Sequence, residues 1–106
     1  MSPAPLFAAL GDETRLFIID RLCTRGPQSI AHLTTGSKMT RQAITKHLAA
    51  LANAGIVRSE RAGRERVWSV ETARLAEARG YLYRVSARWD AAIERLRSLV
   101  EDRGAP

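Results

Sequence analysis

Basic residues are concentrated in the middle of this chain, where they could bind phosphate groups. Residues 38 to 66 hold seven Lys and Arg side chains against two Glu, a net charge of +5, and the whole chain carries +6. Because cationic side chains that neutralise phosphates release condensed counterions, a localised patch of this kind is typical of a nucleic-acid surface. A merely solvated face is the alternative. The seven basic residues are Lys38, Arg41, Lys46, Arg58, Arg61, Arg64 and Arg66.

The first two turns of a predicted helix over residues 40–54 carry side chains that suit base edges. An Arg side chain fits guanine, a Gln fits adenine, and the methyl group of a Thr meets thymine in the major groove. Lys38, which precedes this helix, and His47, which follows Lys46, are candidates for contacts with the phosphate backbone. Packing or capping is the alternative role of His47. The candidate base readers are Thr40, Arg41, Gln42, Thr45 and Lys46.

Two short segments rich in β-branched and aromatic residues follow, and they predict a hairpin with a basic tip. The expected strands are residues 56–61 and 66–70, joined by the sequence AGRE at residues 62–65. Such a hairpin forms a wing that reaches the adjacent DNA backbone or minor groove. Trp68 is expected to anchor the wing to the body, because a large aromatic side chain buries much apolar area. The predicted phosphate contacts are Arg58, Arg61, Arg64 and Arg66.

Capping signals divide residues 12–55 into three helices. Asp12 is a candidate N-cap for the first, which ends at the Gly-Pro pair of residues 26–27. The second starts near Gln28 or Ser29 and ends at residue 36. Thr40 is the expected N-cap of the third, which runs to residue 54 with Gly55 as its left-handed stop. The expected buried faces are Leu16, Ile19, Leu22 and Cys23 on the first helix and Ile44, Leu48 and Leu51 on the third.

The last third of the chain predicts one long helix with a coiled-coil-like apolar seam. About 30 helical residues extend roughly 45 Å, so the helix cannot bury its whole seam against so small a core, and a dimer is expected. Ile93 and Val100 broaden the seam, and Gly80 is a point where the helix could kink or divide. Tyr81, Tyr83 and Trp89 could line a ligand pocket, but aromatic residues at this spacing are more typical of a core or interface. The two heptad columns are Leu75, Leu82, Trp89 and Leu96, and Ala78, Val85, Ala92 and Leu99.

Length and composition exclude several classes of protein. The 106 residues fit one domain, and no apolar run is long enough to span a bilayer or resembles a secretion signal. The single cysteine, Cys23, excludes an internal disulfide and a thiolate metal framework, which fits a reducing cytoplasm. We expect it to be a small buried hydrophobe, with a redox switch as the alternative. No catalytic or cofactor-binding motif assembles, so neither enzyme activity nor a cofactor is expected.

Two segments carry a resemblance to a known family. LFAALGDETR at residues 6–15 and TRQAITKHLAALANAGIVRSERAGRERVWSV at residues 40–70 strongly resemble the ArsR-type winged helix-turn-helix transcriptional regulators. The resemblance implies a homodimeric DNA-binding repressor, with residues 40–54 as the recognition helix, residues 62–66 in the wing, and the first and last helices as the dimer interface. The interface residues are then Leu6, Phe7, Leu75, Leu82, Val85, Trp89, Leu96 and Leu99.

The resemblance does not extend to the metal sites of the family, whose members are usually released from DNA by a metal ion or another signal. The family's Cys-x-Cys box aligns with Ser29-Ile30-Ala31, which contains no thiol, and no His or Cys follows Val70. The chain is therefore similar to the metal-independent branch. In that branch the inducer is a small molecule, a partner protein or absent.

Together these features predict a mainly α-helical winged helix-turn-helix domain with a small β-hairpin, spanning residues 1–106. Residues 12–71 are the expected DNA-binding core, with the wing at about 56–70, and residues 1–10 and 72–102 the expected dimerisation helices. The predicted function is a cytoplasmic homodimeric repressor that reads an inverted repeat in double-stranded DNA, away from any membrane. The alternatives are an architectural DNA-binding protein that tolerates any sequence and a protein-interaction module. The polar residues Arg41, Gln42 and Thr45 favour specific reading.

Overall fold

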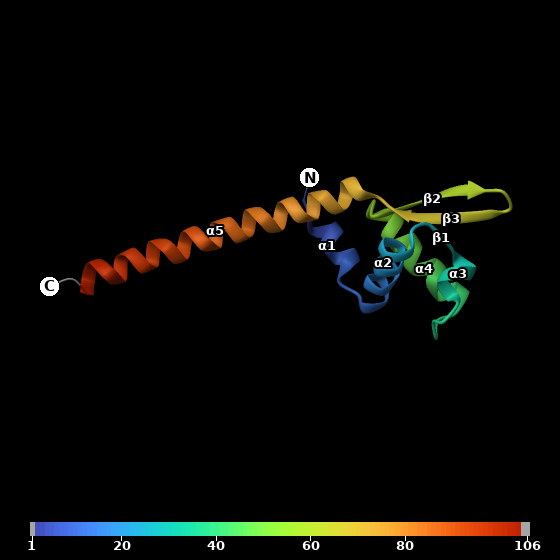
Figure 1. Cartoon of the computed structure of the whole chain (residues 1–106), viewed down its shortest axis with the longest axis horizontal. Helices are drawn as coiled ribbons and strands as arrows, with labels where there is room; N and C mark the ends of the chain where they lie inside the picture. The colour runs from blue at the N-terminus through green and yellow to red at the C-terminus, as the bar shows by residue number, and fades with distance from the viewer. Residues whose placement is uncertain (1, 105–106) are drawn as a thin grey trace.

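The computed structural model describes residues 2–104 and is mainly helical, with a small antiparallel sheet, as the sequence predicts (Figure 1). Four helices and three strands form a body, and a fifth helix leaves it. The elements are α1 (Ala4–Leu10), α2 (Glu13–Arg25), β1 (Gln28–Ser29), α3 (Ile30–Thr34), α4 (Arg41–Asn53), β2 (Val57–Ala62), β3 (Glu65–Val70) and α5 (Thr72–Gly104).

Side-chain caps set where the helices of the body begin. The Asp12 carboxylate accepts a hydrogen bond from the backbone N–H of Arg15 at 3.0 Å, at the start of α2. The Thr40 hydroxyl oxygen accepts one from the N–H of Ala43 at 3.1 Å, at the start of α4. Both residues satisfy N–H groups that have no partner within the first helical turn. The two predicted N-caps are confirmed.

The end of α4 is also the one that the sequence predicts. Gly55 has φ +76°, a left-handed conformation that costs glycine little. Its N–H donates to the carbonyl of Ala52 at 2.9 Å, and the N–H of Ile56 donates to the carbonyl of Leu51 at 3.0 Å. This pair of bonds closes the helix and turns the chain directly into β2.

The sheet has the strand order β1-β3-β2, so β3 lies in the middle. On one side β3 pairs with β2 as the predicted hairpin, and we call residues 57–70 the wing. On its other side β3 pairs with β1, where Gln28 faces Trp68 and Ser29 faces Val67. The sequence analysis missed β1, because a strand of two residues has no alternating pattern. Since β1 runs directly into α3, this pairing holds the wing to the helix-turn-helix.

The core lies between the helices of the body and the base of the wing, and Trp68 packs against it as expected. On α2 the buried face differs from the prediction. Leu16 is 49% exposed and Cys23 is exposed, while Ile18 and Arg21 are buried beside Ile19 and Leu22. Leu16 and Cys23 were wrongly assigned to this face, because apolar spacing alone defines its position only to within part of a turn. Cys23 is therefore not a core residue.

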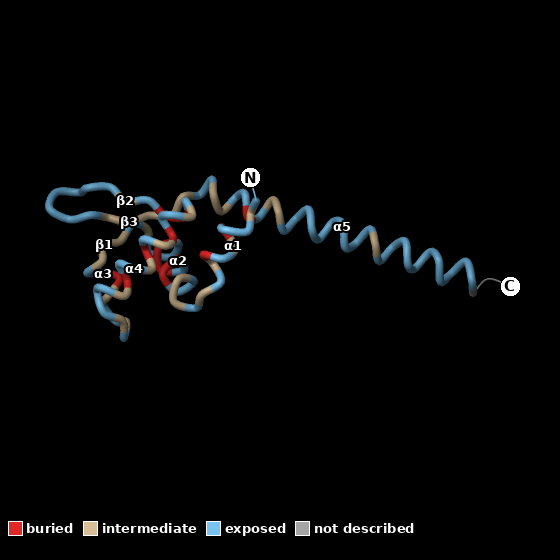
Figure 2. Tube along the Cα trace, turned by 180° about the vertical axis from the view of Figure 1, so that it is seen from behind, coloured by how far each residue is buried: buried red, intermediate tan, exposed pale blue. Residues whose placement is uncertain are grey.

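Helix α5 extends far beyond the body (Figures 1 and 2). The molecule measures 75 × 28 × 21 Å, and its radius of gyration is 20.0 Å, against about 13 Å for a compact domain of this length. Ala78 is buried against the body and Leu75 is half-buried, whereas the large apolar residues from Leu82 onward are exposed. Gly80 does not divide α5, which is one continuous element of 33 residues. As expected, the helix leaves most of its seam uncovered within one chain.

Candidate nucleic-acid interface

The two faces of α4 separate structural residues from candidate reading residues. Ile44, Leu48 and Leu51 are fully or almost fully buried and hold the helix to the body. The five candidate base readers are all exposed. This division follows from the helical period of 3.6 residues, which places residues four apart on one face. The structure therefore brings together, on one exposed surface, Thr40, Arg41, Gln42, Thr45 and Lys46.

Hydrogen bonds within α4 limit what two of these residues can offer a base. The Thr40 hydroxyl oxygen is engaged in capping the helix, at 3.1 Å from the Ala43 nitrogen. The Thr45 hydroxyl donates to the carbonyl of Arg41 at 2.7 Å, so its hydrogen is committed and its methyl group stays available. By contrast, the Arg41 and Gln42 side chains make no hydrogen bond to any residue in the described range 2–104. These two side chains keep their full donor capacity for a ligand.

The wing carries several cations at short spacing. Arg61 on β2 lies directly opposite Arg66 on β3, and both are exposed. Like charges in directly opposed positions destabilise a sheet, and an anion between them would offset that repulsion. Gly63 has φ +65° at the first of the two loop residues, as a type II′ turn requires, and Arg64 follows it at the tip. Arg66 also donates a hydrogen bond to the Ser59 hydroxyl at 2.9 Å.

The tip of the wing and the start of α4 meet at one shallow hollow of about 240 Å³. Arg41 lines this hollow together with Arg64 and Arg66, and Glu65 is the carboxylate among them. Residues 29–31, where β1 joins α3, complete the lining. The β1–β3 pairing therefore places a candidate base reader and two candidate phosphate contacts on the same surface. A strongly cationic, concave edge of this kind suits a polyanion.

Three other predicted contact residues lie away from this hollow or have partners of their own. Lys38 is exposed in the turn before α4. Arg58 lies at the base of the wing, opposite Ser69, with its Nη1 atom 3.7 Å from a carboxylate oxygen of Glu71. His47 is half-buried, which favours the packing alternative for this residue.

Arg21 positions the turn before α4, and the sequence analysis missed it. Its Nη1 atom donates to the carbonyls of Leu33 at 3.1 Å and Thr35 at 2.9 Å, and its Nη2 atom donates to that of His32 at 3.1 Å. The guanidinium also lies 5.6 Å from the centre of the Phe17 ring. Carbonyls at a helix end lack partners within the helix, and Arg21 supplies them from α2. The available signal was a basic residue between Ile19 and Leu22, in the stretch LFIIDRL that holds two charged residues.

The predicted dimerisation residues fall into two groups. Leu82, Val85, Trp89, Leu96 and Leu99 are between 41% and 66% exposed along α5. Phe7 is half-buried, with its ring centre 5.4 Å from that of Tyr81, and Leu75 is half-buried against the core. Leu6 has no exposed surface, so the expectation that it lies in the interface is wrong. It was assigned from its helix alone, and it lies on the side of α1 that packs into its own core.

Residues 2–104 were also considered as the location of a membrane-spanning helix or a metal site. No helix there combines the length and apolar character needed to cross a lipid bilayer. Within the same residues, no three His, Cys, Asp or Glu side chains come together as a metal site.

Comparison with known proteins identifies the family. The sequence pattern described as "Bacterial regulatory protein, arsR family" matches residues 12–59. The HTH-type transcriptional regulator Rv2034 of Mycobacterium tuberculosis is 32% identical over 103 residues, which cover 97% of this chain and 92% of that protein. The chain belongs to the ArsR family. This ArsR-family chain is thus a transcriptional regulator with a DNA-binding helix-turn-helix.

Further relatives agree with this assignment. An ArsR-like transcriptional regulator from Rhodococcus sp. RHA1 has a solved structure that matches with a TM-score of 0.80 and 40% identity, covering 91% of this chain and 90% of that one. An uncharacterized HTH-type transcriptional regulator of Bacillus subtilis, YuzN, is 44% identical over 68 residues, covering 58% of this chain and 74% of that protein. These relatives are described as transcriptional regulators, not as enzymes. The ArsR-type winged helix-turn-helix fold predicted from the sequence is confirmed.

Proposed function

We propose that this ArsR-family regulator is a homodimeric repressor that reads an inverted repeat in double-stranded DNA. The observation that carries the proposal is the surface on which Arg41 of α4 meets Arg64 and Arg66 of the wing tip. With α4 in the major groove, Arg41 and Gln42 reach base edges while the wing tip lies against the adjacent backbone. Base contacts then supply specificity, and wing contacts supply affinity that does not depend on sequence.

The seam of α5 supports the dimer. Leu82 is 54% exposed, Trp89 is 66% exposed and Leu96 is 57% exposed on one helix. Contiguous apolar surface of this kind on a soluble protein marks an interaction site. A second copy offers the same seam, and a two-fold pair would bury both. Two α4 helices related by that axis would read the two halves of a palindromic site about one turn of DNA apart.

Repression follows from the same geometry when the site overlaps a promoter, because the bound dimer then excludes the transcription machinery. A regulator that acts on chromosomal DNA in bacteria is expected in the cytoplasm. The exposed reading residues favour sequence-specific binding over an architectural role. The cationic hollow favours nucleic acid over a protein partner.

The decisive experiment is selection of bound sequences from a random DNA pool by the purified full chain near physiological salt. Enrichment of an inverted repeat, followed by reduced transcription from a promoter carrying it, is the expected result. Salt-sensitive binding without enrichment would replace the proposal with the architectural alternative. Absence of DNA binding at low salt would favour the protein-interaction alternative. For a dimer with about three phosphate contacts per protomer, we expect affinity to fall by roughly 10³-fold or more between 50 and 200 mM salt.

A further inference from the structure

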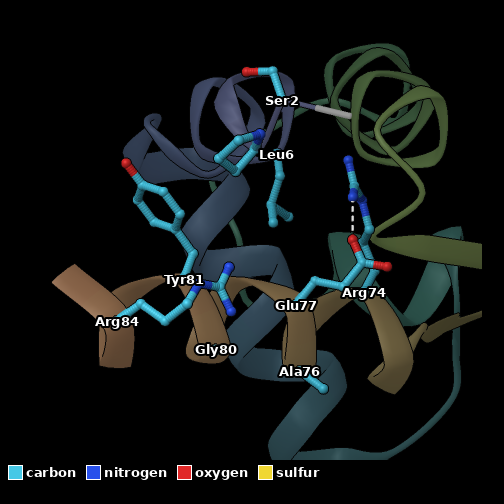
Figure 3. A pocket seen from close by; sticks show the side chains of 9 residues that line it. Ser2, Leu6, Arg74, Ala76, Glu77, Gly80, Tyr81 and Arg84 are labelled. Atoms are coloured by element: carbon cyan, nitrogen blue, oxygen red, sulfur yellow. Dashed lines mark hydrogen bonds and ion pairs between the residues drawn. The ribbon is translucent and has the colours of Figure 1, made fainter. Parts of the chain in front are cut away.

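A cavity of about 450 Å³ lies between α1 and the first turns of α5, outside the DNA-binding surface (Figure 3). We propose that it binds a small organic anion with an apolar body, of the class of aromatic or short aliphatic carboxylates. Its volume lies within the range of roughly 300–1,000 Å³ that is usual for small-molecule sites. The residues that carry the argument are Leu6, Arg74, Glu77, Gly80, Tyr81 and Arg84.

The charges around the cavity leave one cation without a counter-charge. Arg74 is already engaged, since it forms an ion pair with Glu77 and its Nε atom donates to the Ala54 carbonyl at 2.9 Å. Arg84 forms no ion pair or hydrogen bond with any residue in the described range 2–104. Figure 3 shows its guanidinium folded back along α5 toward the cavity. A guanidinium presents a planar fork of donors that matches a carboxylate.

Gly80 leaves open space beside the Arg84 guanidinium. A glycine within a helix is less favourable than alanine, so its presence in the middle of α5 needs a local reason. A Cβ atom at residue 80 would stand 3.4 Å from the Nη1 atom of Arg84, in van der Waals contact with the guanidinium. Without this methyl group, the space next to the cation stays free for a ligand.

Most of the remaining lining is apolar, with Ser2 as a polar residue at its edge. Leu6 lies on the inner side and has no exposed surface, and Pro3, which precedes α1, also lines the cavity. The Tyr81 ring stands at the other edge, held by Phe7 at a ring-centre distance of 5.4 Å and an interplanar angle of 53°. Tyr81 is thus the one of three candidate pocket aromatics that lines this cavity, whereas Tyr83 and Trp89 do not. An apolar body against Leu6 and Tyr81, with its carboxylate on Arg84, matches the lining.

The cavity lies between the two elements whose spacing would set the geometry of the dimer. A ligand that fills it separates or fixes α1 and α5, and it would thereby change the fit to two half-sites. This coupling to DNA rests on the function proposed above. Binding of the anion itself does not, because the cavity belongs to one protomer.

The first test measures binding without DNA. The ¹⁵N-labelled full chain is titrated with benzoate, 2-naphthoate and hexanoate up to 10 mM, and with the neutral amide of each acid as control. We expect at least one carboxylate to shift the backbone amide signals of Leu6, Gly80 and Tyr81 in a saturable way, while its amide does not. Absence of any saturable shift, equal shifts by acid and amide, or shifts confined to the wing arginines would overturn the proposal.

Two variants distinguish a loss of carboxylate binding from a loss of folding. Arg84→Gln removes the cation and is expected to weaken carboxylate binding by about tenfold or more. Gly80→Ala is expected to raise the melting temperature, since alanine favours the helix, and at the same time to weaken binding. Arg79→Gln is the matched control, because Arg79 is an exposed arginine of the same helix that does not line the cavity. Equal affinity in all three variants and the unmodified chain would refute the site.

The effect of the carboxylate on DNA affinity is measured separately from carboxylate binding itself. Addition of the binding carboxylate is expected to change affinity for the selected DNA in the unmodified chain and in Arg79→Gln but not in Arg84→Gln. Carboxylate binding without any change in DNA affinity would refute the coupling between the cavity and DNA binding, but it would not refute the carboxylate site. If the chain selects no DNA sequence while the carboxylate still binds, the proposed function fails and the site stands.

Discussion

The Nη1 atom of Arg21 on α2 lies 2.9 Å from the carbonyl oxygen of Thr35, the residue that ends α3. The same guanidinium binds the carbonyls of His32 and Leu33. A single buried side chain thus holds the segment that leads from α3 to the recognition helix. The orientation of α4 relative to α2 depends on a polar contact as well as on the apolar core.

Arg21→Met is expected to lower the free energy of unfolding by about 2–4 kcal/mol, because it removes the donors to three carbonyls while keeping an apolar stem. Urea unfolding measures this change. Arg25→Met, on an exposed position of the same helix, should change stability by less than about 0.5 kcal/mol. The affinity of Arg21→Met for DNA should fall. The slope of log affinity against log salt concentration (the salt slope) should stay unchanged, since Arg21 contacts no phosphate. A reduced slope would contradict this assignment.

Arg41→Ala and Gln42→Ala are expected to lower the preference for the selected DNA over random DNA by about 1–3 kcal/mol each, because they remove donors that reach base edges. Arg64→Ala should weaken binding to both DNAs equally. It should also reduce the magnitude of the salt slope by about one, the amount expected for the loss of one phosphate contact. Fluorescence anisotropy at several salt concentrations distinguishes the two effects. If all three variants lose affinity equally on both DNAs, the division between reading and backbone residues is wrong.

Thr40→Ala is expected to destabilise the chain by about 1 kcal/mol, because the Ala43 N–H loses its 3.1 Å acceptor at the start of α4. Thr40→Ser keeps the hydroxyl and should stay within about 0.5 kcal/mol of the unmodified chain. Thermal and urea unfolding give the stabilities. A Ser variant as unstable as the Ala variant would show that the Thr40 methyl group, not the cap, carries the effect.

Leu82→Lys and Trp89→Lys are each expected to give monomers by sedimentation, because a charge in the apolar seam opposes its burial against a second copy. DNA affinity should then fall by roughly 10²–10⁴-fold, since the two half-site contacts are no longer linked. Tyr83→Lys is the control, because Tyr83 is 75% exposed and lies outside both heptad columns. Dimers that persist in the Leu82 and Trp89 variants would remove α5 from the interface.

The Asp12 cap makes stability depend on pH in the acid range. The hydrogen bond from the Arg15 N–H is the largest cause that holds the pKa of Asp12 below its ordinary value of 3.8 in the folded chain. The ionised carboxylate therefore stabilises the fold above about pH 4, and this contribution is lost as the pH falls through the lower, folded-state pKa. Asp12→Asn should be less stable than the unmodified chain at pH 7, and the difference should shrink as the pH falls below 3.8. Urea midpoints across this range measure it, and a difference that grows toward low pH would contradict the sign.

Local signals accounted for much of the fold. Asp12 and Thr40 cap their helices, and Gly55 ends α4, because capping depends on a few neighbouring residues. The hairpin was predictable from its strand composition and turn residues. Strand β1 was not, since its two residues acquire a strand conformation only by pairing with Val67 and Trp68.

The candidate site was predictable residue by residue but not as an arrangement. Arg41 and Arg64 were both named from their types, yet their meeting at one hollow depends on how β1 docks against β3. Arg21 was not named from the sequence, because a hydrophobic pattern singles out apolar side chains, whereas the burial of this arginine depends on three carbonyls that accept its hydrogen bonds. Leu6 was misplaced because an apolar residue on a short helix has two possible neighbours, its own core and a second chain.

Because α5 is long, a small change in its tilt moves its far end by a much larger distance than its base. From Leu82 to its end the helix is a free rod of about 35 Å, and a tilt of about 5° at its base displaces the far end by about 3 Å. That displacement is close to the rise of one base-pair step, about 3.4 Å. In a dimer joined through α5, a small change at the base of the helix would therefore shift the two α4 helices relative to the two DNA half-sites by about one base-pair step. Such a change need not alter any contact within the DNA-binding surface.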